Sequence, residues 1–391
     1  MHLSIFNPDH DLALANFSST YTPPTSARKM MEDMETLPVW YAESPHVAVS
    51  DKKYDVHVAA ITEKLCIRHN LIPFSEMAQH RIRHIEPWGW NPAIRKKFLD
   101  AGVTASILPT LSEIEQRKEY SGRRHAVAIL RFLQEEEPSF CGESHYFNNI
   151  TALIAYLSKE NRDYVLKMPY SGSGKGLIWI KGEITSKQAD WCRRVVTQQG
   201  GVVAEPVLDR IQDFAMEFLM RNGTVEFVGY SLFDTSASGA YLGNRLLRDE
   251  DIEKVLSQYI DRTILHWLQQ TLKERLVSQF PLYNGYLGVD MMICKEKNNR
   301  FRVQPCVEIN MRMNMGMVAH IFRKRCMHET KSGIFRVTYF NKEHQAIKNH
   351  HAMLRNYPLA IHQSKIFSGY VPLTAVNENT RYVAYAIVAD F

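Results

Sequence analysis

Short apolar runs and longer segments with helical spacing alternate along the first 118 residues. HLSIF (2–6) and HVAVS (46–50) predict strands, because apolar side chains recur there at the spacing of a half-buried β-strand. An Asn-Pro pair before AIRKKFLD and Gly102 after it are typical of the beginning and the end of a helix. VTASILP (103–109) predicts a further strand. Strands that alternate with helices predict a three-layer α/β domain over residues 1–118.

Two hairpins on either side of a long helix dominate the pattern between residues 214 and 311. FAMEFLM and TVEFVGYSLF flank Asn222-Gly223, and Asn-Gly is the strongest short-range signal for a tight hairpin turn. Residues 249–279 have apolar positions at helical spacing. YLGVDMMIC and FRVQPCVEINM then flank the polar residues 295–300. The pattern therefore predicts a mixed α+β architecture for this part of the chain.

Composition narrows the class of protein. The 391 residues predict two to three domains, and 45% hydrophobic with 23% charged residues is ordinary for a globular protein. A net charge of +5 with mixed signs argues against nucleic acid as a partner. No apolar run approaches the length needed to span a bilayer, and MHLSIFNPDHDLALA lacks the basic start and long apolar stretch of a signal peptide, so we expect neither feature. Six dispersed cysteines without a CxxC pair predict free thiols in the cytoplasm.

The segment VLKMPYSGSGKGLIWI contains a candidate phosphate loop. Lys175 is followed by Gly176, so the hydroxyl that a Walker loop needs for magnesium is missing, and the glycine spacing does not fit GxGxxG. The apolar run 177–180 after the loop predicts a strand. We therefore expect a hairpin loop whose backbone N–H groups fold over phosphates, with Lys167 as a fixed charge. A surface Gly/Ser turn is the alternative interpretation.

Three oxygen-bearing side chains lie in the second hairpin. Asp290 is inside one apolar strand, and Glu308 and Asn310 are two apart on the next, so they share a face. A hairpin would bring that face beside Asp290. Carboxylate and amide oxygens suit Mg²⁺, which also binds phosphate oxygens. A solvated face of an edge hairpin is the alternative.

VVAEPVLDRIQDF carries a third, weaker signal. Glu205 ends an apolar strand, and Asp213 begins the next one eight residues later. A linker with free backbone groups near Val207 and Leu208 can lie along an adenine, and a carboxylate beyond it can bind ribose hydroxyls. A solvated acid in a loop is the alternative.

The order of these features resembles the ATP-grasp superfamily over about residues 120–319, and EINMRMNMG is similar to the family's Glu-x-Asn-x-Arg ending. FNPDHDLALA, PPTSARKM and PWGW resemble uncharacterised bacterial ATP-grasp proteins. The resemblance implies an N-terminal pre-ATP-grasp domain and a two-subdomain ATP-grasp fold. The expected parts are 1–118 (α/β domain), 119–204 (subdomain A with the lid), 205–330 (subdomain B with the metal site) and 331–391 (α+β extension).

The resemblance also implies residue roles. Lys167 would bind the α- and β-phosphates, Glu205 would face the adenine amino group with Val207 and Leu208 along the ring, and Asp213 would bind the ribose. The lid over the triphosphate would consist of Ser171, Gly172, Ser173, Gly174, Lys175 and Gly176. Asp290, Glu308 and Asn310 would hold one or two Mg²⁺ ions, with Mn²⁺ as a substitute and Glu308 bridging.

One feature of the family is missing from the expected place. A second phosphate-binding Lys usually lies near the start of the helix before the lid strand, but SHYFNNITALIAYL contains none. His145 or Asn148 could substitute for it, or the site could be weaker.

The acceptor side has two candidates. The resemblance puts Arg245 on the transferred phosphate, where its charge would stabilise the transition state and the acyl phosphate. Arg312 is expected on the strand face of Asn310, where it could bind a substrate carboxylate bidentately. For each arginine, a surface ion pair is the alternative.

The implied activity is ATP-dependent ligation of a small-molecule carboxylate to an amine through an acyl phosphate. A kinase-like phosphotransferase and a non-catalytic nucleotide-binding regulatory module are the alternatives. The sequence names neither the acid nor the amine, and a homodimer is an open option.

Overall fold

A computed structural model describes residues 1–50, 56–172, 176–236 and 239–389. The chain divides into two compact units. Unit 1 comprises residues 1–115, 242–252 and 312–391, and unit 2 comprises residues 116–241 and 253–311. This division into two units does not test the expected division of the chain into four parts, which stays a prediction.

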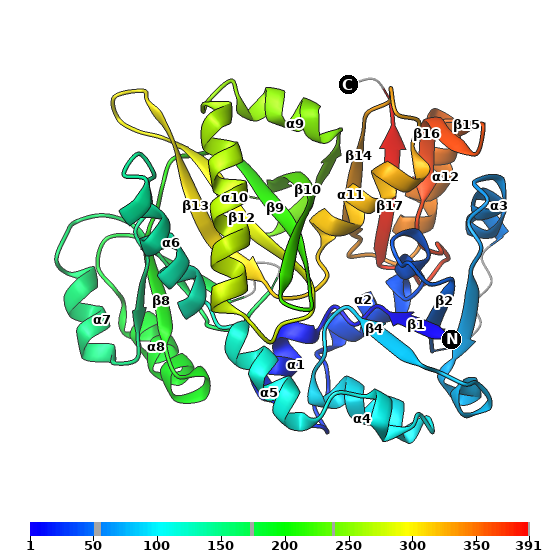
Figure 1. Cartoon of the computed structure of the whole chain (residues 1–391), viewed down its shortest axis with the longest axis horizontal. Helices are drawn as coiled ribbons and strands as arrows, with labels where there is room; N and C mark the ends of the chain where they lie inside the picture. The colour runs from blue at the N-terminus through cyan, green and yellow to red at the C-terminus, as the bar shows by residue number, and fades with distance from the viewer. Residues whose placement is uncertain (51–55, 173–175, 237–238, 390–391) are drawn as a thin grey trace. The chain divides into compact units, whose positions relative to one another are not determined.

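Unit 1 begins with a parallel sheet in the order β3-β2-β1-β4 (Figure 1). Its strands and the nearby helices are β1 (His2–Ile5), β2 (His46–Val49), β3 (Asn70–Pro73), β4 (His84–Pro87), α1 (His10–Asn16), α2 (Thr25–Met34), α3 (Val56–Lys64) and α4 (Pro92–Asp100), with 3₁₀ turns η1 (Leu37–Trp40) and η2 (Phe74–Gln79). Leu3, Ile85 and Phe98 belong to its hydrophobic core. The predicted strands at 2–6 and 46–50 and the helix that ends before Gly102 are confirmed.

The predicted strand at 103–109 is wrong. The segment instead forms a single 3₁₀ turn, η3 (Ala105–Ile107). The amide of Val103 donates to the Phe98 carbonyl at 3.0 Å, and that of Ile107 donates to the Thr104 carbonyl at 3.2 Å. These local bonds satisfy donors that a strand would offer to a neighbouring strand.

The remainder of unit 1 contains antiparallel strands in the order β11-β14-β17-β16-β15. Their bounds, with those of the remaining helices, are β11 (Tyr241–Leu246), β14 (Gly333–Tyr339), β15 (Ala360–His362), β16 (Lys365–Pro372), β17 (Tyr382–Val388), α11 (Met315–Cys326) and α12 (Gln345–Asn356). The chain passes from one unit to the other after residues 115, 241, 252 and 311; the second passage lies within β11 and the third within α9 (Asp249–Leu256).

Unit 2 has a small antiparallel sheet in the order β5-β8-β6-β7. The strands and nearby helices are β5 (His145–Phe147), β6 (Tyr164–Lys167), β7 (Leu177–Ile180), β8 (Val202–Pro206), α5 (Leu111–Tyr120), α6 (Arg124–Glu136), α7 (Ile150–Leu157) and α8 (Ser186–Gln199). Thr185 and Gln188 form a capping box at the start of α8, and Gly200 ends the helix at φ +84°. Strands β6 and β7 pair antiparallel, which confirms the two predicted strands on either side of the glycine segment.

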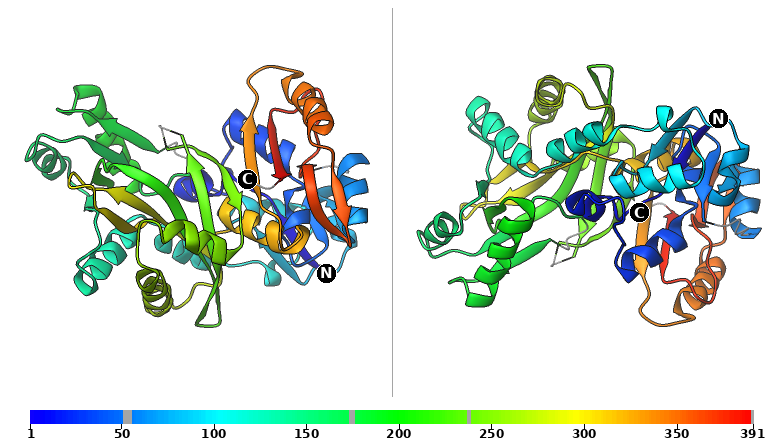
Figure 2. Two further views of the ribbon diagram at one scale, coloured as in Figure 1. Left: turned by 90° about the horizontal axis from the view of Figure 1, so that it is seen from above. Right: turned by 90° about the horizontal axis from the view of Figure 1, so that it is seen from below.

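The second sheet of unit 2 has the antiparallel order β13-β12-β9-β10, from β9 (Arg210–Arg221), β10 (Thr224–Thr235), β12 (Gly285–Lys295) and β13 (Phe301–Asn310). Both predicted hairpins are confirmed, and Asn222 and Gly223 have the positive φ angles of a tight hairpin turn. Figure 2 shows α10 (Arg262–Gln279) on one side of this sheet in both views. The predicted continuous helix at 249–279 is two helices, α9 and α10, and the Asp261 side chain caps the second.

Candidate functional site

Asp290, Glu308 and Asn310 lie together on β12 and β13. The strand register places Asp290 opposite Glu308 and Gly288 opposite Asn310. The Asn310 amide donates to the Asp290 carboxylate at 3.0 Å. The set consists of two carboxylates and one amide. No group of three or more His, Cys, Asp or Glu side chains that could hold a metal occurs among the described residues.

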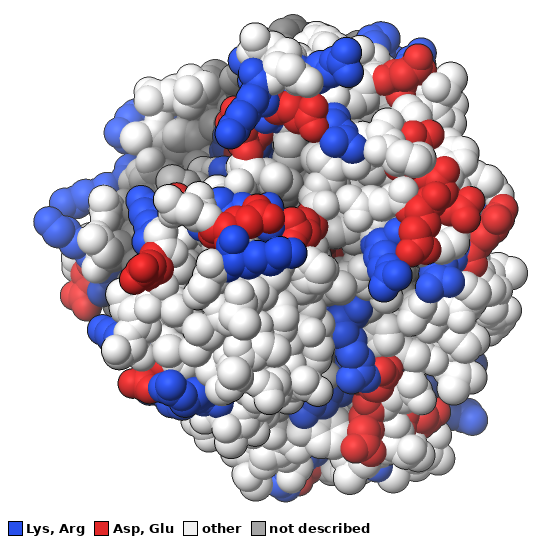
Figure 3. All heavy atoms as spheres, turned by 90° about the vertical axis from the view of Figure 1, so that its left-hand side faces the viewer, with Lys and Arg blue, Asp and Glu red and all other residues white. Residues whose placement is uncertain are grey.

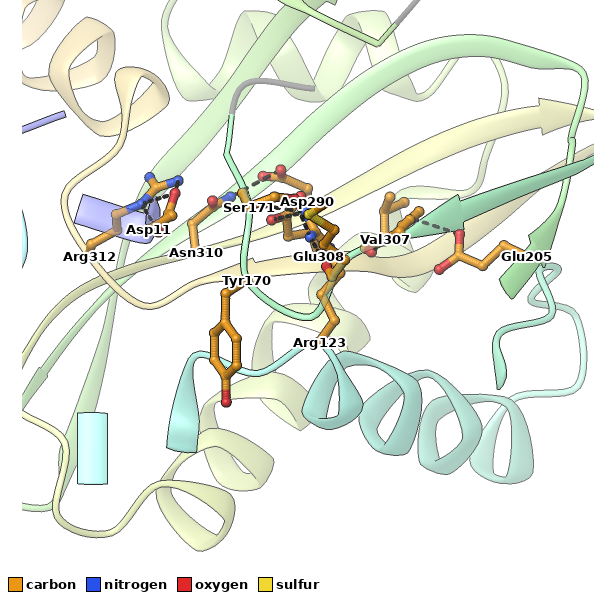
Figure 4. Close-up of polar contacts among 12 residues, drawn as sticks. Asp11, Arg123, Tyr170, Ser171, Glu205, Asp290, Val307, Glu308, Asn310 and Arg312 are labelled. Carbon is orange, nitrogen blue, oxygen red and sulfur yellow. Dashed lines mark hydrogen bonds and ion pairs between the residues drawn. The ribbon is translucent and has the colours of Figure 1, made fainter. Parts of the chain in front are cut away.

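Arg123 joins this face to the start of the glycine segment. It lies just before α6, its side chain is 6% exposed, and its Nη2 is 2.5 Å from Glu308 Oε1. Its Nη1 donates to Ser171 Oγ at 2.8 Å and to the Met168 carbonyl at 2.5 Å. Figure 4 shows Arg123 reaching from its helix toward Glu308, while the Tyr170 side chain points away. Sequence reasoning missed this residue, although the adjacent pair Arg123 and Arg124 is visible in the sequence.

Lys167, at the end of β6, forms a second buried ion pair. Its ammonium nitrogen is 2.7 Å from Glu205 Oε2, and the two side chains are 8% and 7% exposed. The same nitrogen donates to the carbonyl of Val307, the residue before Glu308, at 3.4 Å. Ser144 donates to the other Glu205 oxygen at 2.9 Å. The two small-sheet residues Lys167 and Glu205 are therefore anchored beside β13.

The described part of the predicted lid is tightly packed at both ends. The Met168 amide donates to the Gly176 carbonyl at 2.9 Å, which closes the β6–β7 pair. A Cβ at Gly176 would lie 2.2 Å from the Ser171 side chain, so the backbone approach requires glycine there. Gly172 is half-buried, and Ser173, Gly174 and Lys175 lie outside the described residues. Because β7 is a strand, a Walker loop that opens a helix is excluded.

Two of the residues expected to bind the adenosine, Val207 and Asp213, form hydrogen bonds within the protein. The Val207 amide is not free, because it donates to the Asp163 carbonyl at 2.9 Å; Leu208 adjoins it along the chain. Asp213 lies within β9 and accepts hydrogen bonds from Thr235 Oγ1 at 2.7 Å and from Arg210 at 2.9 Å. Burial raises the pKa of Asp213, and these two donors oppose the rise. These two hydrogen bonds fix the position of the Asp213 carboxylate within the protein.

The two predicted acceptor arginines belong to unit 1. Arg245 is exposed on β11. Arg312 lies beyond β13, which ends at Asn310, so the strand register does not place it on the face of Asn310. The guanidinium of Arg312 instead makes a bidentate contact with Asp11, at 2.9 Å from Nε and 2.7 Å from Nη2 (Figure 4).

The suggested substitutes for the missing lysine lie on the surface. His145 is exposed and its Nε2 is 3.1 Å from a Glu143 oxygen. Asn148 is exposed as well. Arg123, rather than either of them, is the cation that contacts Glu308.

The surface offers no large area of one charge on the face drawn in Figure 3, where Lys and Arg alternate with Asp and Glu. In the described part of the chain no helix is both long and apolar enough to cross a bilayer.

Comparison with known proteins gives structural matches only. No family model matches the sequence, and no curated protein matches it. Biotin carboxylase from Campylobacter jejuni, solved as a complex with beta-gamma-ATP, superimposes with a TM-score of 0.54 at 12% identity, over 100% of this chain and 87% of that chain. This chain has an ATP-grasp fold.

Two other solved structures that are similar to this chain have lower TM-scores than this match. N5-carboxyaminoimidazole synthetase from Staphylococcus aureus with ADP gives 0.49 at 12% identity, over 100% of this chain and 93% of that chain. L-amino acid ligase from Bacillus licheniformis gives 0.44 at 11% identity, over 99% and 93%. The predicted fold class, an N-terminal α/β domain before a two-subdomain ATP-grasp fold, is confirmed.

Proposed function

We propose that this protein is an ATP- and Mg²⁺-dependent ligase that joins a small-molecule carboxylate to an amine. The observation that carries the proposal is the Arg123–Glu308 contact at 2.5 Å beside the Asp290–Asn310 hydrogen bond. It brings buried positive charge, hard oxygen donors and the start of a glycine-rich segment to one place. That combination suits a metal-bound polyphosphate better than an apolar ligand.

Each element of the site has a proposed role. Lys167 and Arg123 bind phosphate oxygens, and residues 171–176 close over them. Glu205, with the backbone of Val207 and Leu208, contacts the adenine, and Asp213 contacts the ribose.

The donor set fits Mg²⁺, with Mn²⁺ as a substitute. Two carboxylates and one amide oxygen are hard ligands, and Mg²⁺ commonly takes one or two carboxylates together with phosphate oxygens. Asp290, Glu308 and Asn310 would hold the ion. When bound, it would neutralise part of the phosphate charge.

The reaction follows from the chemistry of carboxylates. A carboxylate oxygen attacks the γ-phosphorus of ATP, the bond to ADP breaks, and an acyl phosphate forms. An amine nitrogen then attacks the acyl carbon, phosphate leaves, and an amide remains. Lys167 and Arg123 stabilise the negative charge that develops on the transferred phosphate.

On the acceptor side, Arg245 is proposed to contact the transferred phosphate. Arg312 is proposed to bind a substrate carboxylate in exchange for Asp11.

We place the enzyme in the cytoplasm and expect small-molecule substrates as its partners. All six cysteines are free, and four of them are buried, which suits a reducing compartment. A homodimer stays an untested option.

The test is an assay of ADP release from Mg²⁺–ATP with pairs of amino acids, dicarboxylates and short peptides, followed by mass spectrometry. The ligase predicts ADP, phosphate and an amide in equal amounts. A phosphorylated acceptor would identify a phosphotransferase instead. Tight Mg²⁺–ATP binding without any product across the panel would favour a regulatory module.

A further inference from the structure

Two cysteines of unit 2 meet beside β13. The main-chain amide of Cys141 donates to the Val303 carbonyl at 2.8 Å. Cys294, on β12, lies opposite Arg302, the residue before Val303. The thiols of Cys141 and Cys294 interact as hydrogen-bond partners, although the two residues are far apart in the sequence. They form a dithiol pair that the spacing of the cysteines along the chain does not reveal.

The chain on both sides of Cys141 is held in place. The Arg302 side chain donates to the three successive carbonyls of residues 138–140, at 2.9 Å from Nη2 to the first and at 2.6 Å from Nε to the second. The Gly142 carbonyl accepts from the Gln134 amide at 2.9 Å. Because these bonds fix the backbone around Cys141, its thiol is kept beside the thiol on β12.

The two thiols differ in exposure and in acidity. Cys294 is 3% exposed, whereas Cys141 is half-buried. The hydrogen bond with Cys294 holds the pKa of the Cys141 thiol below its usual value, with help from the charge of Arg302 and against the effect of burial. The same hydrogen bond, together with burial, raises the pKa of Cys294. Since the thiolate is the nucleophile in thiol–disulfide exchange, Cys141 is the attacking sulfur and Cys294 is the resolving one.

A cavity of about 530 Å³ lies next to the half-buried thiol. Phe140, the residue before Cys141, lines it, and so does Val303, which accepts the Cys141 amide. All of the residues that line the cavity belong to unit 2. Its volume is in the range of pockets that hold small molecules. A small disulfide reagent can therefore approach Cys141 from this side.

We propose that Cys141 and Cys294 are a redox modification site, at which a small disulfide such as glutathione disulfide forms an intramolecular disulfide bond. This inference goes beyond the proposed function, because it concerns neither ATP nor the substrates of ligation.

The exchange takes place in two steps. The Cys141 thiolate attacks one sulfur of glutathione disulfide, the S–S bond of the reagent breaks, and one glutathione leaves as a thiolate. That thiolate takes the proton of Cys294, whose sulfur attacks the Cys141 sulfur and displaces the second glutathione. The second thiolate takes from the solvent the proton that Cys141 had released. The two protein thiols lose two electrons, and glutathione disulfide is reduced to two glutathione thiols.

The test is incubation of the full chain with reduced glutathione and with glutathione disulfide, followed by alkylation, non-reducing proteolysis and mass spectrometry. Wild type should yield a linked Cys141–Cys294 peptide with glutathione disulfide alone, and reduction should remove the link. Cys294→Ser should instead accumulate glutathione on Cys141, because the resolving thiol is missing. Cys66→Ser, which removes an exposed cysteine, is the matched control and should leave the linked peptide unchanged.

Alkylation of the reduced protein by iodoacetamide tests the order of the two thiols. Cys141 should react at least about tenfold faster than Cys294, which is more buried and less acidic. The pH midpoint of Cys141 alkylation should rise in Cys294→Ala, because the hydrogen bond is then lost.

The site is refuted if both cysteines remain thiols in glutathione disulfide, or if Cys141 pairs with another cysteine instead. Absence of glutathione from Cys141 in Cys294→Ser, or an unchanged pH midpoint in Cys294→Ala, would refute the roles of the two sulfurs. Should the Cys294 variants not fold, Cys141→Ser decides the question: Cys294 should then stay a thiol, and glutathione on Cys294 would contradict the proposal.

Discussion

In unit 2, Lys167 faces Glu205 and Arg123 faces Glu308, so each buried cation has a carboxylate partner. In unit 1, Asp9, just before α1, and Glu35, just after α2, both interact electrostatically with Lys97. The first arrangement contains two direct ion pairs, whereas in the second burial raises the pKa of Asp9 to about 6. The difference teaches that two kinds of buried site respond oppositely to the loss of a charge. Removing one member of a direct pair leaves an uncompensated buried ion, whereas neutralising a carboxyl group whose charged form is penalised by burial stabilises the folded state at high pH.

The largest effect is expected at the Lys167–Glu205 pair. Lys167→Met leaves Glu205 buried and unpaired, and this should lower the free energy of unfolding by about 3–5 kcal/mol. Lys167→Met with Glu205→Gln should recover at least half of the loss, because no buried ion is then left. Urea denaturation measures both, with the exposed Lys181→Met as the control. A double variant no more stable than the single one would show that the two side chains are not coupled.

The next effect concerns catalysis. Glu308→Gln removes the charge that we assign to the metal and should reduce ADP formation about 10²–10³-fold, the size typical of removing one transition-state contact. The exposed Glu226→Gln on β10 is the matched control. ADP release at saturating Mg²⁺–ATP measures the rate, and a thermal midpoint shows whether the variant is folded. Unchanged turnover in a folded variant would remove Glu308 from the metal site.

A pH-dependent effect of up to about 3 kcal/mol is expected at Asp9, which lies just before α1, because burial raises its pKa from 3.8 to about 6. The folded state binds this proton more tightly than the unfolded state, so the free energy of unfolding falls as pH rises through that interval. The Asp9→Asn variant lacks this decrease in the free energy of unfolding. The free energy of unfolding of Asp9→Asn minus that of wild type should therefore be larger at pH 8 than at pH 4.

Urea denaturation at both pH values tests this, with the exposed Asp100→Asn as the control. If the difference between Asp9→Asn and wild type is the same at pH 4 and pH 8, Asp9 is not a destabilising buried acid.

The smallest effect, about 1 kcal/mol, is expected at the Arg312–Asp11 contact. Arg312→Lys keeps the charge but loses the bidentate geometry of the guanidinium. Thermal unfolding measures the loss, and the exposed Arg131→Lys serves as a control. A loss no larger than that of the control would mean that the fork contributes nothing to stability.

The sequence was sufficient for the elements whose pattern is local. The Asn222-Gly223 hairpin and the helix that ends before Gly102 are specified by residues within a few positions of one another. The strand at 103–109 was mispredicted because an apolar run does not reveal whether a neighbouring strand is present to pair with it. A 3₁₀ turn satisfies the same donors locally.

Some residues of the candidate site could likewise be predicted from the sequence, and others could not. Asp290, Glu308 and Asn310 could be grouped from sequence, because a hairpin fixes their register. Arg123 could not, since its partner Glu308 is 185 residues away and nothing local distinguishes it from Arg124, which pairs with Glu119. Arg312 lies beyond β13, which ends at Asn310, and the alternating pattern in the sequence does not mark that end.

The most direct measurement of the central claim is titration of the protein with ATP in the presence of Mg²⁺ and again with EDTA, for wild type and Glu308→Gln. The account predicts that wild type binds ATP at least tenfold more tightly with Mg²⁺ and that Glu308→Gln loses this gain. Equal ATP affinity in all four titrations, or no ATP binding by wild type, would contradict it.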